Sequence, residues 1–567
     1  MASLFWFIVL IGILIFAHEG GHFLFAKLFR VKVLTFSLGF GTPVSLGRRF
    51  RLSWKRGETE YRIAWFPIGG FVRMLGDDPT EPIAEADQPR AFLTQPPWKR
   101  LLIIFGGPLF SVMLAVPIYF TYNLLQSTAR APVIGRVIPG SPAAEAGLLP
   151  GDEIVRLGTS RIESWEELDE ALQAAGGGEV ELAVRRDGQG EKRFRIKPYA
   201  EVDETGLELL GERYELGLRH QLQGNILGVV AGSPAARAGI RCWDKVLAAD
   251  GKPVEGWAEL QRALAAKGES EVGLQLVRAA EVQIGAITIR APSMVEARVR
   301  PVPASSAPAW TIAHGESYTG LEPVDLYVMD LLDGYPAQKA GVQPGDKIVG
   351  MFGKPIYTWE EFSRHIILHK REGPIPVTVR KPHEVVELEL TPAEIAETND
   401  FKQTTRKPGM GVTYQPNLLS GEMIPRPNRL AYALKSSVTD TWRAISMNVL
   451  GFVRIFQGKV KATEAIGGPI MIFTVAGKSA ERGWRTFLTM MAFLSVLLGL
   501  LNLLPIPILD GGHIAFIAVE VMIRKPVPLQ ARIVASYVGL VLLIGLMAFA
   551  IFNDIHRYWP EISSVFG

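Results

Sequence analysis

Residues Leu4–Ala26 read LFWFIVLIGILIFAHEGGHFLFA, an apolar stretch whose only ionisable side chains are His18, Glu19 and His22. At a rise of about 1.5 Å per residue, a helix of this length can cross a bilayer. Ionisable groups inside an apolar span are costly, so by default they indicate a functional site. A chance match on a soluble core helix is the alternative, and the long apolar flanks disfavour it.

The two histidines are spaced i and i+4, so on a helix both imidazoles lie on one face, one turn apart. Two neutral imidazoles at this spacing can bind one Zn²⁺, with Glu19 beside the metal rather than on it. A catalytic zinc site also needs a third protein ligand and an open position for water. Asp510 is the candidate, because Pro505 and Pro507 interrupt the preceding helix and could turn this carboxylate toward the histidines. A helix-terminal cap is its alternative role.

The composition bounds the class of protein. The chain has 567 residues, of which 48% are hydrophobic and 21% charged, and its mean hydropathy is +0.18. This mixture is typical of a membrane protein with a soluble insert. A net charge of +3 gives no reason to expect nucleic acid as a partner. Cys242 is the single cysteine, which excludes an intrachain disulfide and a multi-cysteine zinc site.

We predict an α-helical polytopic membrane protein with four transmembrane helices, a short membrane-associated β-sheet and inserted PDZ-like β-rich domains. The apolar start lacks a basic n-region and a small-residue cleavage site, so we interpret it as a retained span. The predicted boundaries are 1–27 (first transmembrane helix with HEGGH), 28–98 (membrane-associated β-hairpins and linker), 99–126 (second transmembrane helix), 132–200, 220–295 and 320–393 (PDZ-like modules), 425–461 (amphipathic interfacial helix), 484–512 (third transmembrane helix with LDGG) and 530–553 (fourth transmembrane helix).

Alternating stretches between glycines predict short hairpins after the first span. They form either an ordinary loop sheet or a sheet whose strand pairs with an unwound substrate segment. The segment 425–461 predicts either an amphipathic helix at the membrane surface or a plain linker helix. Its apolar side would carry Trp442, Val449, Leu450, Val453 and Phe456, and its basic side Lys435, Arg443, Arg454 and Lys459.

One pattern recurs three times between residues 132 and 392, namely a Pro-Ala turn, an Ala-Gly step, an Asp before an apolar strand, and a helix that starts at Trp. The repeat resembles bacterial PDZ domains, which bind extended peptides or chain ends by β-augmentation. In the second copy, Cys242 and Trp243 stand where the other copies have Pro-Gly. Peptide capture and a steric role as a size filter are both open.

Lysine and arginine gather in the loop between the first two spans and in the loop between the last two. Such loops are expected on the cytoplasmic side, which puts the repeat insert and both termini on the opposite side.

The motifs HEGGH, GFG and FPIGG, GGP, the PDZ-like modules and NLLPIPILDGGH together resemble the site-2 protease family of zinc intramembrane metalloproteases, and within it the bacterial branch of the sigma-E stress response. The resemblance implies that His18, His22 and Asp510 bind Zn²⁺ and that Glu19 is the catalytic acid–base. It further implies a substrate-binding role for Asn502, Gly69, Gly70 and Phe71.

For function, the resemblance implies cleavage of transmembrane segments of single-pass membrane proteins, such as an anti-sigma factor after extracytoplasmic trimming, and also of remnant signal peptides. The PDZ-like modules would gate access and bind peptide segments or chain ends. The protein would lie in the bacterial inner membrane, in contact with the lipid bilayer, with the insert and both termini periplasmic and the active site near the cytoplasmic side. Two features depart from the family: the motif G-P-x-x-N ends here in Ser111, and three modules are present rather than two.

Other functions are possible in principle. A catalytically silent membrane scaffold that presents PDZ modules would have no use for Glu19 beside a metal. A membrane zinc protease with glutamate as third ligand would need a further glutamate on a later span, and no serine-protease motif stands out. His365 and His369 are also spaced i and i+4, but no Glu follows His365, and we interpret them as a surface pair. His513 could orient the site, although a structural role is favoured.

Overall fold

The structure is a computed structural model of the full chain. It describes all residues except 1, 47–49, 78–81, 139, 187, 202–212, 221–224, 255, 285–286, 308–316, 370–372, 383, 399–403, 414–422, 459–462, 464–466 and 567.

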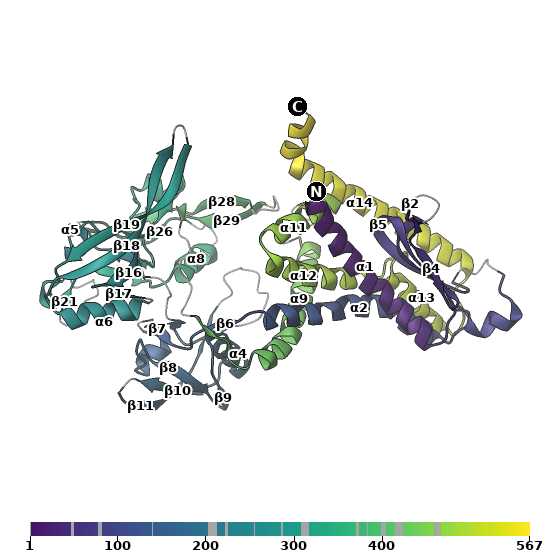
Figure 1. The fold of residues 1–567 in the computed structure, drawn as a ribbon, viewed down its shortest axis with the longest axis horizontal. Helices are drawn as coiled ribbons and strands as arrows, with labels where there is room; N and C mark the ends of the chain where they lie inside the picture. Colours follow the sequence, from purple (N-terminus) through teal and green to yellow (C-terminus); the bar gives the residue numbers. More distant parts are fainter. Residues whose placement is uncertain are drawn as a thin grey trace. The chain divides into compact units, whose positions relative to one another are not determined.

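The chain forms two compact units, which we describe separately (Figure 1). The first unit, called the helical unit, comprises Met1–Gln126, Thr398–Thr405 and Asn428–Gly567. The second, called the insert, comprises Ser127–Glu397 and Arg406–Pro427.

Seven helices of the described chain build the helical unit. They are α1 (Ala2–Leu28), α2 (Pro97–Leu124), α9 (Arg429–Phe456), α11 (Pro469–Glu481), α12 (Trp484–Asn502), α13 (Asp510–Ile523) and α14 (Leu529–Phe566). Four of them contain stretches long and apolar enough to cross a membrane: Ser3–Leu28, Pro97–Leu124, Trp484–Asn502 and Leu529–Trp559. These four stretches lie where the hydropathy pattern predicts spans.

Helix α2 packs against α1, α9 and α12, with α1 at very short range. A Cβ on Gly21 of α1 would lie 2.1 Å from the carbonyl oxygen of Gly106, and a Cβ on Gly106 would lie 2.7 Å from that of Gly21. The side of α2 that meets α12 is equally close, because a Cβ on Gly499 would lie 2.8 Å from the Pro108 oxygen. Small residues permit this close packing of one backbone against another. In lipid, such contacts matter because burial of apolar side chains provides little driving force for helix association.

The third span ends earlier than predicted. Helix α12 stops at Asn502, before the expected proline break, but Asp510 begins a separate helix, α13, so the segment 484–512 is not one transmembrane helix as its predicted boundaries imply. The break contains Pro505 and Pro507, which lack the backbone N–H that a continuing helix requires. The carboxylate therefore lies in the first turn of a new helix rather than at the end of the span.

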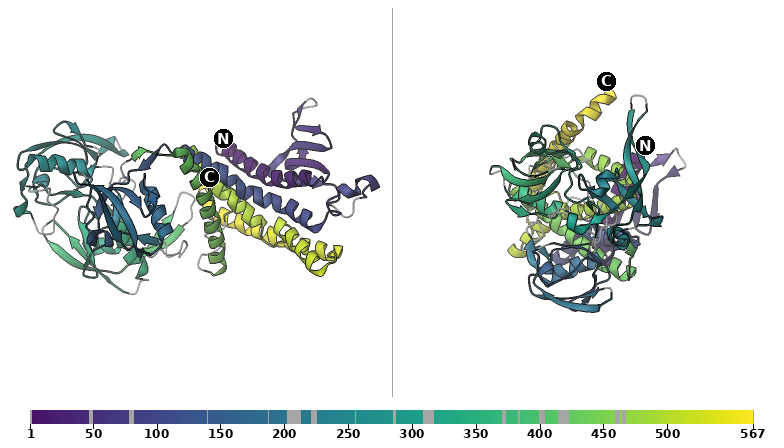
Figure 2. Two further views of the ribbon diagram at one scale, coloured as in Figure 1. Left: turned by 90° about the horizontal axis from the view of Figure 1, so that it is seen from below. Right: turned by 90° about the vertical axis from the view of Figure 1, so that its left-hand side faces the viewer.

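An antiparallel sheet lies beside α1, made of β1 (Val33–Pro43), β4 (Ser53–Arg56) and β5 (Thr59–Met74), as Figure 2 shows. Shorter elements nearby are β2 (Ser45–Leu46), β3 (Phe50–Arg51) and the 3₁₀ helix η1 (Glu85–Arg90). Strand β5 pairs with β1 twice, since Phe36 lies opposite both Tyr61 and Val72. The second half of β5 therefore runs along the outer side of β1, away from β4.

Helix α9 turns its small and polar side toward α2 and α12. Ala433, Ser437 and Thr441 are buried, whereas Trp442 and Phe456 are exposed. The expected apolar side thus faces outward, which suits a helix whose surroundings are lipid rather than water.

The expected basic side of α9 needs one correction. Arg454 is only 6% exposed, although the charge pattern places it on the basic surface, whereas Lys435 and Arg443 are exposed as expected. Its burial is decided by how the end of α9 packs, which the charge pattern does not contain. Lys459 lies outside the described residues.

The insert contains three modules with one layout. The first consists of β7 (Ile134–Val137), α3 (Pro142–Glu145), β8 (Glu153–Leu157), β9 (Ser160–Arg161), α4 (Trp165–Ala175), β10 (Val180–Arg186), β11 (Gly190–Ile196), β12 (Tyr199–Glu201), β13 (Arg213–Glu215) and β14 (Leu218–His220). The second consists of β15 (Asn225–Val229), α5 (Pro234–Arg237), β16 (Lys245–Ala249), β17 (Lys252–Pro253), α6 (Trp257–Lys267), β18 (Val272–Ile284), β19 (Ile287–Val299), β20 (Val302–Pro303), η2 (Ala304–Ser306), β21 (Ser317–Tyr318) and β22 (Leu321–Pro323). The third consists of β23 (Asp330–Leu331), α7 (Pro336–Lys339), β24 (Lys347–Met351), β25 (Lys354–Pro355), α8 (Trp359–Leu368), β26 (Ile375–Arg380), β27 (Val385–Leu390), β28 (Ala393–Thr398), β29 (Thr404–Gly409) and β30 (Val412–Thr413). Outside them, β6 (Thr128–Arg130) pairs with β31 (Met423–Pro425).

The repeated motif residues have local structural reasons. In each module the repeated Asp accepts a hydrogen bond, 2.9 Å long, from the backbone N–H three residues before it. The Trp-led helices of the first and third modules are capped by Ser164 and Thr358, whose hydroxyls accept from the N–H three residues later. Each module encloses its own apolar core.

Each module is completed by a strand beyond its predicted end. β14 pairs with β7, β22 with β15, and β30 with β23. The predicted ends at residues 200, 295 and 393 are therefore too early. The closing strands are only two or three residues long, but each follows a glycine at positive φ (Gly217 at 79°, Gly320 at 81°, Gly411 at 80°), and this recurring Gly was the available signal.

Cys242 and Trp243, which replace the Pro-Gly of the other two copies, lie where the second and third modules meet. Both pack against Val324 and Tyr327, which lead into the third module. Trp243 has φ 72°, in a region that costs a bulky residue roughly 1–3 kcal/mol and where the other copies carry glycine. The Tyr327 ring in turn fills the space above Gly228, whose Cβ would lie 2.2 Å from it.

A buried ionic cluster joins the same two modules. Glu322, on closing strand β22, is 0% exposed, and its carboxylate lies 2.5 Å from Lys347 Nζ and 3.0 Å from Arg380 Nη2. The Tyr327 hydroxyl donates to this carboxylate at 3.2 Å and accepts from Arg380 at 2.6 Å. Burial alone would raise the pKa of Glu322, but Lys347 and Arg380 outweigh it and hold the pKa below its usual range. We call this cluster the inter-module joint.

We expect Glu322→Ala to loosen the inter-module joint, because it leaves two buried cations without their carboxylate, at a cost of about 3–5 kcal/mol. Hydrogen–deuterium exchange of the full chain should then be faster at residues 324–328. Because the pKa of Glu322 is depressed, its contribution is complete at neutral pH and is lost as the pH falls through that pKa. As a control, Glu153→Ala removes an exposed pair with Arg185 and should change exchange little; equal effects would contradict the joint.

Candidate metal centre

Three predicted ligand side chains converge inside the helical unit. Nε2 of His18 lies 3.2 Å from Asp510 Oδ2, Nε2 of His22 lies 3.5 Å from the same oxygen, and the two Nε2 atoms are 3.4 Å apart. Four ligands placed tetrahedrally at about 2.0–2.1 Å from a zinc ion are separated by about 3.3–3.4 Å. The three observed separations match that arrangement. Among the described residues, no other group of three or more His, Cys, Asp or Glu side chains comes as close together.

The imidazoles reach this position because α2 presents bare backbone to them. A Cβ on Gly107 would lie 2.2 Å from His22 Nε2 and 2.9 Å from His18 Cε1. Together with the contact between Gly21 and Gly106, this explains the second glycine of HEGGH and both glycines of GGP, whereas a Cβ on Gly20 would meet nothing within 4 Å. The glycines serve close approach between helices, not helix breaking.

The carboxylate is brought in by a loop that folds back on α13. Cβ atoms on Gly511 and Gly512 would lie 2.2 and 2.3 Å from the carbonyl oxygens of Leu504 and Ile506. The two glycines after Asp510 are thus required by the loop, which aims the first turn of α13 at the histidines.

The outer nitrogens of both imidazoles are held by α2. His22 Nδ1 lies 2.9 Å from the backbone oxygen of Ile103, and His18 Nδ1 lies 3.0 Å from Ser111 Oγ. A carbonyl oxygen can only accept, so His22 carries its proton on Nδ1 and turns the lone pair of Nε2 toward Asp510. Asp510 Oδ2 itself is buried and has no hydrogen-bond donor in the part of the chain that the structure describes.

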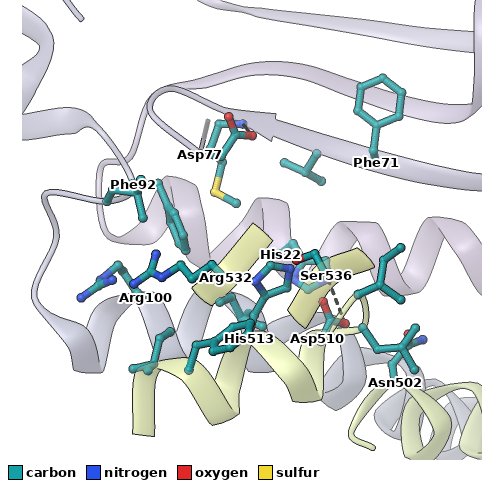
Figure 3. Close-up of a pocket in the computed structure, with 18 of the residues that line it drawn as sticks. His22, Phe71, Asp77, Phe92, Arg100, Asn502, Asp510, His513, Arg532 and Ser536 are labelled. Atoms are coloured by element: carbon teal, nitrogen blue, oxygen red, sulfur yellow. Dashed lines mark hydrogen bonds and ion pairs between the residues drawn. The ribbon is translucent and has the colours of Figure 1, made fainter. Parts of the chain in front are cut away.

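A cavity of about 610 Å³ opens beside the three ligands (Figure 3). Glu19, Asn502, Gly70 and Phe71 all line it, so the predicted base and most of the predicted substrate residues share one space. Gly69 is next to this lining in sequence but does not line the cavity itself. Its φ is 104°, and a Cβ there would lie 2.2 Å from the Phe40 ring. A Cβ on Gly70 would lie 3.0 Å from Glu19 Cγ, which means that strand β5 passes directly over the predicted base.

Sequence reasoning missed several residues of the site. Ser111 and the Ile103 carbonyl, which hold the imidazoles, lie on another helix, and a backbone carbonyl has no sequence signal. Arg100 and Arg532 line one part of the cavity, and both pair with Glu520, at 2.5 and 3.4 Å. These residues are too far apart in sequence for a local pattern. His513 lines the cavity as well, and its orienting role stays a prediction.

The second histidine pair lies elsewhere. His365 and His369 are on α8 and at its end in the third module, where both rings contact Phe352. No acidic or cysteine side chain joins them in a group of ligands among the described residues. Both residues are half-buried rather than fully at the surface, and the expectation that they bind no metal stays a prediction.

Comparison with known proteins gives one family. The model of peptidase family M50 matches residues 6–546. A relative from Neisseria meningitidis serogroup A, described as a candidate zinc metalloprotease, is 28% identical over 573 residues and covers 98% of this chain and 99% of its own. The regulator of sigma-E protease RseP of Salmonella typhimurium is 27% identical over 578 residues, with 98% of this chain and 100% of its own covered. A solved PDZ domain protein from Parabacteroides distasonis was also matched, with 13% identity and a TM-score of 0.13; the match covers 49% of this chain and 95% of that protein.

The paired glycines of HEGGH give a matched test of the helix contact. Gly21→Ala should lower the zinc content of the purified protein severalfold or more, because its Cβ would displace α2 and the groups that hold both imidazoles. Gly20→Ala meets nothing within 4 Å and should leave zinc content unchanged. Metal analysis of both variants at equal protein concentration decides; equal zinc in the two would contradict the close-approach explanation.

Proposed function

This chain belongs to peptidase family M50, and from this premise we propose that it is a zinc-dependent intramembrane endopeptidase that cleaves transmembrane segments of single-pass membrane proteins. The zinc metalloprotease names of its relatives support metalloprotease activity, and its four apolar helices agree with a bacterial membrane protein.

One observation carries the metal assignment. Two imidazole nitrogens and one carboxylate oxygen, all electron-pair donors, lie 3.2 to 3.5 Å apart in a largely buried space. Without a cation between them, such groups would repel one another, and Asp510 Oδ2 would remain a buried acceptor without a donor. A donor set of His₂ and one carboxylate beside an open cavity is typical of catalytic zinc sites. His18, His22 and Asp510 would hold the ion.

Bound zinc would lower the pKa of a coordinated water to about 7 and polarise the scissile carbonyl. Glu19, on the same cavity but outside the ligand set, would accept a proton from the attacking water and deliver it to the leaving amide nitrogen. The family resemblance and this position support Glu19 as the acid–base.

The substrate must reach the site in extended form, because a regular helix occupies its own peptide groups with hydrogen bonds. Residues Gly70 to Val72, in the second half of β5, line the cavity. This half pairs with β1 along one edge and with no other described strand along the opposite edge. An unwound segment added along its other side would lie over Glu19. Asn502, at the end of α12, lines the same cavity and would bind the substrate backbone.

The remaining parts of the proposal follow from the family resemblance. The substrate would be an anti-sigma factor-like protein after extracytoplasmic trimming, or a remnant signal peptide. The insert and both termini would be periplasmic, the active site would lie near the cytoplasmic side of the inner membrane, and the PDZ-like modules would gate access.

A silent scaffold is the alternative function. It would not need a carboxylate beside three metal-ligand atoms, so Glu19 on the cavity wall favours an enzyme.

Two substitutions separate metal binding from proton transfer. Glu19→Gln should keep stoichiometric zinc and lower the cleavage rate by about 10²–10⁴-fold or more, since it removes the proton acceptor but no ligand. Asp510→Ala should lose both zinc and activity. Metal analysis and cleavage of a single-pass substrate in membranes measure the two effects, and His369→Ala should alter neither. Full turnover by Glu19→Gln, or full zinc loading of Asp510→Ala, would refute the respective role.

Gating by the insert predicts a preference for trimmed substrates. A single-pass substrate without its extracytoplasmic domain should be cleaved at least about tenfold faster than the full-length form, because a bulky domain would be held away from the cavity. Parallel assays in membranes, with Glu19→Gln as the background control, measure the ratio. Equal rates would argue against gating while leaving the hydrolytic chemistry intact.

A further inference from the structure

We propose that Ser111 is a positioning residue of the metal centre, whose hydroxyl accepts a hydrogen bond from Nδ1–H of His18 and thereby fixes Nε2 as the metal-binding atom. This inference rests on the zinc site of the proposed function and assigns a role to the position where the chain departs from the G-P-x-x-N motif.

The two ligand histidines are anchored in different ways. Both Nδ1 atoms find an oxygen on α2, at 2.9 Å for His22 and 3.0 Å for His18. For His22 the oxygen is the Ile103 carbonyl, which cannot be changed by substitution. For His18 it is the Ser111 side chain, the partner of that Nδ1 among the described residues, and a single substitution can remove it.

The tautomer decides whether His18 can bind a metal. A neutral imidazole has one N–H and one lone pair, and a ligand histidine needs its lone pair on the nitrogen that faces the ion. With the proton on Nδ1, Nε2 offers its lone pair 3.2 Å from Asp510 Oδ2. With the opposite tautomer, an Nε2–H would point at the carboxylate and occupy the metal position. The Ser111 hydroxyl can donate as well as accept, and it stabilises the first form when its oxygen accepts from Nδ1–H.

Ser111 is itself held rigidly. It is 0% exposed, and its backbone oxygen accepts a 2.6 Å hydrogen bond from the Ser495 hydroxyl of α12. On α2 it follows Gly107 by four residues, so the gap that admits the imidazoles and the hydroxyl that orients one of them lie on one face. On the far side, a Cβ on Gly499 would lie 3.2 Å from the Ser111 Cβ. The hydroxyl therefore has little freedom to leave His18.

The departure from the family motif agrees with this role. Serine and asparagine differ in size, but both have a side-chain oxygen that can accept a hydrogen bond. What the position would have to supply is an acceptor for a ring N–H, and serine does so. A direct role in substrate binding is not needed to explain a polar residue here.

The test is the zinc affinity of the full-length protein in detergent, measured by competition with a chromophoric chelator. We expect Ser111→Ala to lower the affinity about 10- to 100-fold, which is the usual effect of losing such an orienting partner. Substituted Co²⁺ should also show a shifted visible absorption spectrum, a direct sign of altered ligand geometry. Ser437→Ala removes a buried hydroxyl of α9 that donates to the Leu434 backbone oxygen rather than to the metal centre, and should stay within about threefold of the unsubstituted chain.

A second pair of variants distinguishes loss of the hydroxyl from a change in packing at residue 111. Ser111→Thr and Ser111→Val have nearly the same shape, and only the first keeps the hydroxyl. Thr should bind zinc about tenfold or more tightly than Val.

The outcomes separate this inference from the proposed function. If the unsubstituted chain binds no stoichiometric zinc, the metal site itself fails. If it binds zinc and Ser111→Ala binds equally well, or Thr and Val are equal, or Ser437→Ala loses as much, the positioning role of Ser111 is overturned and the zinc site stands.

Discussion

Three lone pairs aimed at one point in an apolar span are the constraint on which the helical unit depends. Nε2 of His18, Nε2 of His22 and Oδ2 of Asp510 lie within 3.5 Å of one another, where few waters can separate or solvate them. Such an arrangement is unfavourable unless a dication occupies the centre, and the scaffold must hold it against that repulsion when the ion is absent. The surrounding packing therefore has to be close and rigid.

The rigidity comes from backbone contacts rather than from large apolar side chains. Gly21 on α1, Gly107 on α2 and Gly511 on α13 each leave a space that another helix, ring or loop fills at under 3 Å from a would-be Cβ. Lipid tails compete well for apolar side chains but cannot replace such contacts. Gly70 in the same way lets strand β5 pass close over Glu19. Glycine contacts therefore position the metal ligands, the predicted acid–base and the strand proposed to pair with substrate.

The sequence was informative where the physics is local. The i, i+4 spacing of the histidines, the prolines before Asp510 and the apolar runs of the four spans each follow from the chain within about 25 residues. It was uninformative where partners are far apart or lack side chains: Ser111 and the Ile103 oxygen hold rings on another helix, and the closing strands of the modules are too short to show alternation. The end of the third span was wrong for a different reason, because the proline break was recognised but the new helix that starts at Asp510 was not. The burial of Arg454 depends on tertiary packing that no charge pattern reports.

The inter-module joint bears on the third module, which is the other departure from the family pattern. Among the described residues, the ionic partners of Glu322 in the second module are Lys347 and Arg380 of the third, so separating these modules would expose an uncompensated acid or leave cations buried. The strained Trp243 adds apolar contact at the same place. Contacts of this kind would hold the two modules as one body, so the third module would not add a moving part of its own. If the insert gates by size, the geometry of the filter is set by the first module against this fused pair, and substitutions at the joint would alter selectivity without touching any peptide-binding groove.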